Sequence, residues 1–67
     1  MKVREVIQIL ERGGWRLVRQ TGSHRQFHHP DRLGTVTVAG KLSDEVRRGT
    51  LNSIWRQAGL SEGKRRG

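Results

Sequence analysis

The 67 residues provide for one small domain and leave no room for a second domain or a deep enclosed pocket. Fourteen Lys and Arg residues against six Asp and Glu give a formal charge of +8, which indicates a polyanionic partner, either nucleic acid or an acidic protein. Cysteine is absent, which excludes disulfides and thiolate metal sites and suits a reducing compartment. Charged residues interrupt the apolar N-terminal segment, so we expect no signal peptide, no membrane span and a cytoplasmic location.

Most of the charge belongs to the part of the chain that we expect to fold. We expect a single domain over residues 1–61 and a basic flexible tail over residues 62–67. Residues 61–67 contain Lys64, Arg65 and Arg66 against Glu62, a net +2, so +6 remains on the domain. The domain itself therefore attracts anions.

The first segment, MKVREVIQILERGG, has the periodicity of an amphipathic helix. Its apolar side chains follow the i, i+3, i+4, i+7 spacing that places them on one face, at Val3, Val6, Ile7 and Leu10. Gly13 and Gly14 follow, and glycine is typical of a helix C-terminus. We expect a helix that ends at this glycine pair.

Three segments with strand character follow. Residues 15–20 and 24–29 flank a short Thr-Gly-Ser link, and this arrangement predicts a β-hairpin. Residues 30–34, Pro-Asp-Arg-Leu-Gly, predict a second turn. Residues 35–39, Thr-Val-Thr-Val-Ala, alternate β-branched side chains and give the clearest strand signal in the chain.

A polar loop and a second helix come next. Residues 40–49 predict a charged loop with a helical turn around residues 43–47, after which Thr50 is expected to cap a helix. Apolar side chains again recur at helical spacing, and Gly59 ends the pattern. The order α-β-β-β-α predicts an α+β fold: a three-stranded antiparallel sheet with two helices on one face and the other face open to solvent.

Alternation along residues 24–29 assigns their side chains to the two faces of the sheet. Phe27 is large and apolar, so we expect it on the helix face, where Arg25 and His29 share its parity. The same alternation in residues 35–39 directs the two valines inward. The open face then receives the other three side chains of the second strand: His24, Gln26 and His28.

The remaining candidates for chemistry have simpler structural explanations. Trp15 and Trp55 could stack on bases, but their spacing places them in the core. Ser23 could be a nucleophile only with a base and an orienting acid, and a role in the hairpin turn fits it better. His24 and His28 lie four residues apart on a strand, about 13 Å at about 3.3 Å per residue, too far to share one metal ion or to flank one phosphate. We predict no metal site and no cofactor.

Short motifs at regular intervals span most of the chain. In order they are Gly14-Trp15, Arg19-Gln20-Thr21-Gly22-Ser23-His24, Phe27 with His29-Pro30, Thr35-Val36-Thr37-Val38-Ala39-Gly40, Gly49-Thr50-Leu51-Asn52-Ser53-Ile54 and Gln57-Ala58-Gly59-Leu60. With these motifs, the sequence resembles the HicA family of toxins from bacterial toxin–antitoxin systems over residues 1–61. The family often has a proline shortly before Gly-Thr-Leu, where this chain has Arg47-Arg48-Gly49.

The resemblance implies a fold like that of double-stranded-RNA-binding domains, in agreement with the element order above. It also implies a metal-independent endoribonuclease that cuts mRNA, depends on the histidine matching His24, and is neutralised by a HicB antitoxin. Considered without the resemblance, a single imidazole fits a solvated surface histidine better than an active site.

Our hypothesis is that His24 acts as general acid or base on the open face of the sheet. The expected RNA contacts are Arg19, Arg25, Lys41 and Ser23. Arg25 fits least well, because its parity directs it to the helix face. Two alternatives stay open: a non-catalytic RNA-binding module of the same fold, and a toxin homologue that has lost its activity.

Overall fold

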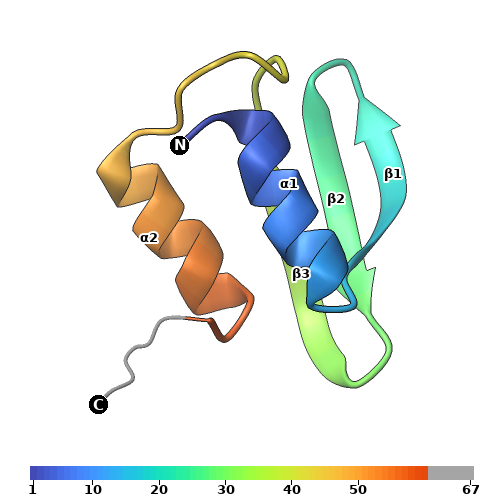
Figure 1. Ribbon diagram of the computed structural model, residues 1–67. Coiled ribbons are helices and arrows are strands. Elements are labelled where there is room, and N and C mark those ends of the chain that lie inside the picture. Colours follow the sequence, from blue (N-terminus) through green and yellow to red (C-terminus); the bar gives the residue numbers. More distant parts are fainter. Residues whose placement is uncertain (61–67) are drawn as a thin grey trace.

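The computed structural model describes residues 1–60 and contains five elements in the predicted order. Helix α1 (Val3–Arg12) precedes three strands, β1 (Arg16–Thr21), β2 (His24–His29) and β3 (Arg32–Val38), and α2 (Arg48–Gln57) follows them. The strands form an antiparallel sheet in the order β1-β2-β3, and both helices lie on one face of it (Figure 1). The α+β fold is therefore confirmed, whereas the predicted tail at 62–67 lies outside the described residues.

The core lies between the two helices and the inner face of the sheet. Phe27 on β2 is 1% exposed, and the valines of β3 are equally buried, so the predicted assignment of faces is confirmed. Trp15 is 2% exposed, and Trp55 is partly buried against the same core. The fully buried apolar residues are Val3, Val6, Leu10, Trp15, Phe27, Val36, Val38, Ile54 and Ala58.

Both helices end in a Schellman motif, in which the two residues after the C-cap donate backwards to the last turn. At the end of α1, the Gly14 N–H donates to Glu11 O (3.0 Å) and the Trp15 N–H donates to Leu10 O (3.0 Å). Gly14 has φ +95°, a value that favours glycine. The motif turns the chain so that Trp15 enters the core directly after the helix.

The β2–β3 connection differs from the prediction in length. The expected turn over residues 30–34 is only two residues long, and β3 begins at Arg32, which pairs with His29. The register then shifts before the pairing of Phe27 with Val36, and Gly34 lies in this irregular stretch with φ +91°. Gly34 therefore belongs to a bulge within the hairpin and not to its turn.

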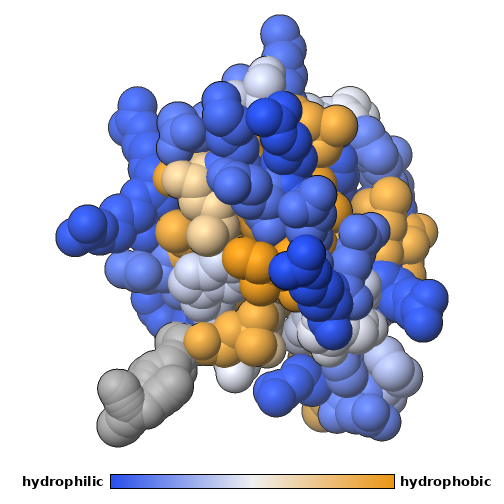
Figure 2. Space-filling view, viewed as in Figure 1, coloured by the Kyte–Doolittle hydropathy of each residue, from blue (hydrophilic) through white to orange (hydrophobic). Residues whose placement is uncertain are grey.

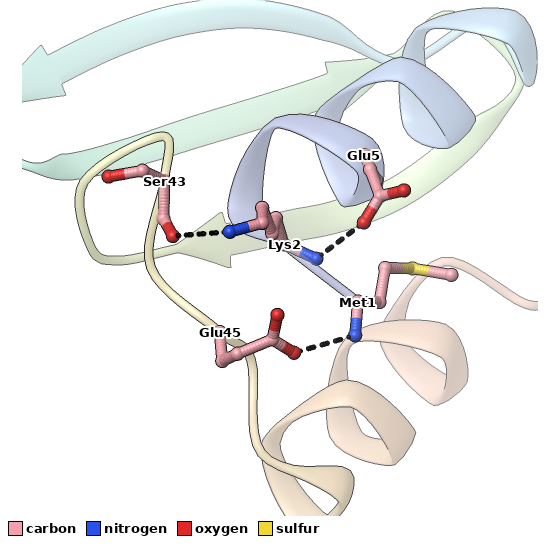
Figure 3. A network of polar contacts seen from close by, with 5 residues as sticks. All are labelled: Met1, Lys2, Glu5, Ser43 and Glu45. Carbon is pink, nitrogen blue, oxygen red and sulfur yellow. Dashed lines mark hydrogen bonds and ion pairs between the residues drawn. The ribbon is translucent and has the colours of Figure 1, made fainter.

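The loop between β3 and α2 pairs with the start of the chain. Val3 N–H donates to Asp44 O (2.9 Å), and the Val46 N–H donates to Met1 O (2.9 Å). Figure 3 shows the accompanying side-chain contacts, in which the N-terminal ammonium lies 2.9 Å from Glu45 Oε2 and Lys2 Nζ donates to the Ser43 carbonyl. The predicted helical turn around residues 43–47 is wrong, because this backbone bonds to α1 instead.

Helix α2 begins two residues before the predicted cap. Its N-cap is Arg47, which makes no side-chain capping bond, and Thr50 lies within the first turn. The prediction that Thr50 caps the helix is therefore wrong. Val46, one residue before Arg47, is partly buried and packs against the core. This contact holds the end of the loop directly before the start of α2. Figure 2 shows that hydrophilic side chains cover most of the helix side of the molecule.

Candidate functional site on the open face of the sheet

The hairpin turn between β1 and β2 positions His24. The turn consists of Gly22 and Ser23 alone, since Thr21 pairs with His24. Gly22 has φ +58° and Ser23 does not have a positive φ, which is the pattern of a type II′ turn. His24 is therefore the first residue of β2, exposed on the face opposite to Phe27.

Side chains directly opposite each other in an antiparallel pair share a face, with Cβ atoms about 5 Å apart. Arg19 pairs with Gln26, which in turn pairs with Thr37 on β3. Arg19 therefore lies on the open face and is a diagonal neighbour of His24. The hairpin thus brings Arg19, one of the expected RNA contacts, near His24.

A bulge in β1 determines what lies further along the open face. Regular pairing from the turn would place Val18 opposite Phe27 and would direct Arg16 to the helix face. The register instead shifts between Leu17 and Arg19, so that Leu17 pairs with Phe27 and Arg16 pairs with His28. Arg16 therefore belongs to the open face. The sequence offers no glycine in this strand to signal the bulge, and Arg16 had no predicted role.

Arg25 joins the hairpin turn to the loop that carries Lys41. Its Nη1 atom donates to the Gly40 carbonyl (2.8 Å) and to the Ser23 carbonyl (3.3 Å). The Gly40 N–H also donates to the Ser23 carbonyl (3.2 Å). These bonds hold Lys41, one residue further on, beside the turn that precedes His24. Arg25 is half-buried and acts here as a backbone cross-link.

The loop after Gly40 has its own support. The Lys41 N–H donates to Asp44 Oδ2 (3.0 Å), and the Asp44 N–H donates to the Lys41 carbonyl (3.0 Å). This reciprocal pair fixes the backbone of Lys41 and leaves its side chain exposed. The structure thus brings four predicted site residues to one end of the sheet: His24, Ser23, Arg25 and Lys41. Arg19 lies one diagonal step away.

The three histidines differ in their partners. Among residues 1–60 the His24 ring has no protein hydrogen-bond partner, whereas His28 Nε2 lies 3.1 Å from Thr35 Oγ1. His29 lies on the helix side, where its Nε2 atom donates to the Gly13 carbonyl and its ring packs edge-on against Trp15. His29 is therefore a structural residue, and His24 is the histidine whose ring nitrogens both lack a protein partner among residues 1–60.

The positive charge of the described part of the chain is not neutralised internally. Within residues 1–60, no ion pair joins a Lys or Arg side chain to a carboxylate, and the one ion pair present uses the N-terminal ammonium. No group of three or more His, Asp or Glu side chains converges in the same residues.

His24 is exposed on the surface of the described part of the chain. An open hollow of about 310 Å³ lies elsewhere, lined by Glu11, Trp15, Arg16 and Leu17 at the β1 edge. No helix within residues 1–60 has the length and apolar character that a membrane span requires.

Taken together, these features define a small basic α+β domain with an exposed histidine on the open face of its sheet. The family model of the HicA toxins of bacterial toxin–antitoxin systems matches residues 3–60, and the chain belongs to that family. Its membership assigns it a toxin role and an antitoxin partner. A comparison with curated proteins finds no match.

Proposed function

We propose that this toxin is a metal-independent endoribonuclease that cleaves mRNA, with His24 as its general acid or base. The observation that carries the proposal is the position of His24: an exposed ring without a protein partner among residues 1–60, at the start of a central strand, with basic residues around it.

The reaction needs few groups. The 2′-oxygen of a ribose attacks the adjacent phosphorus, the bond from phosphorus to the 5′-oxygen breaks, and a 2′,3′-cyclic phosphate and a 5′-hydroxyl result. One proton leaves the 2′-hydroxyl and one reaches the departing 5′-oxygen. An imidazole can perform either transfer near neutral pH, and the nearby cations Arg19 and Lys41 can stabilise the charge that develops on the phosphoryl oxygens.

A single imidazole without a second acid or base limits the rate. General acid–base catalysis by one group contributes about 10² to 10⁴-fold. We therefore expect slow turnover, which is compatible with a protein whose effect is to arrest growth. We also propose that the antitoxin is of the HicB type and that it covers the open face.

The test is cleavage of a long unstructured RNA by purified protein in excess EDTA. Wild type and the control Gln8→Ala, an exposed position on α1, are expected to cut, and His24→Ala is expected to bind RNA with unchanged affinity and not to cut. If wild type binds without cutting, the chain is an RNA-binding module or an inactive toxin. If His24→Ala cuts at the wild-type rate, His24 is not catalytic.

A further inference from the structure

We propose that the open face holds the RNA strand beyond the cleaved bond, at a second phosphate site formed by Arg16, His28 and Thr35. The proposal rests on the proposed function, because it takes RNA as the ligand. It adds residues at the other end of the open face from the hairpin turn that positions His24. The site would fix how the strand lies when the bond at His24 is cut.

Three cross-strand rows cover the open face. The first contains Thr21 and His24, and the second contains Arg19, Gln26 and Thr37. The third row contains Arg16, which pairs with His28, and Thr35, whose hydroxyl lies 3.1 Å from the His28 ring. The second and third rows each contain one arginine from β1 and one threonine from β3.

The bulge at Val18 makes the third row possible. Without it Arg16 would face the helices opposite His29, and the far end of the open face would carry no arginine from β1. With it, Arg16 and Arg19 share the open face although three residues separate them in the sequence. Bulges re-aim side chains in this way near functional sites.

The contact between His28 and Thr35 prepares the row for a ligand. The imidazole is held against the hydroxyl and stays exposed, so its ring can stack on a base while the threonine hydroxyl and the Arg16 guanidinium reach a phosphate. Among residues 1–60 no carboxylate forms an ion pair with Arg16 or Arg19. Both charges are therefore open to an anion from outside.

The spacing of the rows fits one nucleic-acid strand. His24 and His28 are four residues apart on β2, about 13 Å at about 3.3 Å per residue. A stacked strand advances about 3.4 Å per nucleotide, so the third row would meet a phosphate up to about four nucleotides from the cut. Evenly spaced rows of hydroxyl and imidazole groups, two of them with an arginine, match a polymer of regular charge better than an acidic protein surface.

The first arm of the test measures binding without cleavage. The probe is a 2′-O-methyl oligouridylate of about twelve nucleotides, which lacks the nucleophilic hydroxyl and is long enough to span the three rows. Arg16→Gln is compared with Arg56→Gln, an exposed arginine on α2 on the helix side of the molecule. We expect Arg16→Gln to weaken affinity about threefold to tenfold and to reduce the salt slope by about 0.7, and Arg56→Gln to change neither.

The second arm measures cleavage of two chimeric strands, each with a single ribose in a 2′-O-methyl background. One strand extends mainly to the 5′ side of the ribose and the other mainly to the 3′ side. Arg16→Gln is expected to lower kcat/KM about threefold to tenfold on one of the two strands and to leave the other unchanged. His28→Ala is expected to affect the same strand.

The two arms separate this proposal from the nuclease proposal. Equal affinities of Arg16→Gln and Arg56→Gln for the probe, or equal losses on both chimeras, would overturn the second site even if His24 cleaves RNA. If Arg16→Gln weakens probe binding as expected but wild type does not cleave RNA, the second site is supported and the nuclease proposal is overturned. If Arg16→Gln weakened only binding of an acidic antitoxin, the row would be a protein contact and the proposal would be wrong.

Discussion

The His29 imidazole lies between two backbone groups, and its Nε2 atom is 2.9 Å from the carbonyl oxygen of Gly13. On the other side of the ring, the Asp31 N–H donates to Nδ1 (3.0 Å). Since a carbonyl only accepts and an N–H only donates, the ring is the Nε2–H tautomer. One side chain therefore joins the end of α1 to the β2–β3 turn, over the edge of Trp15.

We expect His29→Ala to destabilise the protein by about 1–3 kcal/mol, because two backbone groups lose their partner. Urea unfolding of the purified variant checks this, with His28→Ala as the control for loss of an exposed imidazole on the same strand. A His29→Ala variant as stable as His28→Ala would show that water replaces both bonds without cost.

Gly14→Ala is expected to destabilise the protein by about 1–3 kcal/mol or more, because an alanine there has an unfavourable φ of +95°. An added Cβ would also come within 2.8 Å of the His29 ring. Gly49→Ala is the matched control: Gly49 lies in α2, and its added Cβ meets nothing within 4 Å. That variant is expected to gain up to about 1 kcal/mol. Thermal unfolding of both proteins would show opposite shifts, and a stable Gly14→Ala would contradict the proposed role of Gly14.

The N-terminal ammonium lowers the pKa of Glu45 below its usual value of 4.5, first by its hydrogen bond and then by its charge. A lowered folded-state pKa contributes stability that is present above about pH 4.5 and is lost as pH falls through the folded value. Glu45→Gln should therefore be less stable than wild type at pH 6 and equal to it in strong acid. Because the carboxylate is exposed, we expect a small effect.

Urea unfolding as a function of pH tests this prediction. Glu11→Gln is the control, since Glu11 is exposed and forms no ion pair within the described chain. A difference between wild type and Glu45→Gln that persists unchanged at low pH would mean that the carboxylate is not the source of the stability.

Arg25→Ala is expected to release the loop that carries Lys41. The Gly40 carbonyl would lose its 2.8 Å bond, and the Gly40 N–H, bonded to Ser23, would exchange faster with solvent. Hydrogen exchange at the Gly40 amide measures this directly. The control is Arg19→Ala, which also removes one positive charge but makes no bond to this loop. It should leave the exchange rate of the Gly40 amide unchanged. Faster exchange in both variants would argue against a specific role for Arg25.

The sequence predicted those parts of the fold that depend on local periodicity. The alternation around Phe27 and the paired valines assigned the two faces of the sheet correctly, because burying one apolar face sets the parity of a strand. Both glycine stops were also correct, because a positive φ at the helix end requires glycine. The same parity places His24 on the open face, where the structure has it.

The parts that the sequence did not reveal depend on contacts distant in the chain. The bulge at Val18 shifts the pairing of β1 with β2 by one residue, and no residue type in the strand signals it. The loop at residues 41–46 takes its shape from bonds to α1, and Thr50 gave a local capping signal that those distant contacts overrode. The same bulge directs Arg16 to the open face, so the sequence did not predict where Arg16 lies.

The basic side chains that lack a carboxylate partner within residues 1–60 also affect the fold. Their mutual repulsion destabilises the compact chain, and added salt screens it, so salt is expected to strengthen folding while it weakens RNA binding. Any anionic partner that covers the basic surface removes the repulsion and adds its binding free energy to the stability of the native state. An antitoxin that binds there would act as a folding ligand for the toxin as well as an inhibitor.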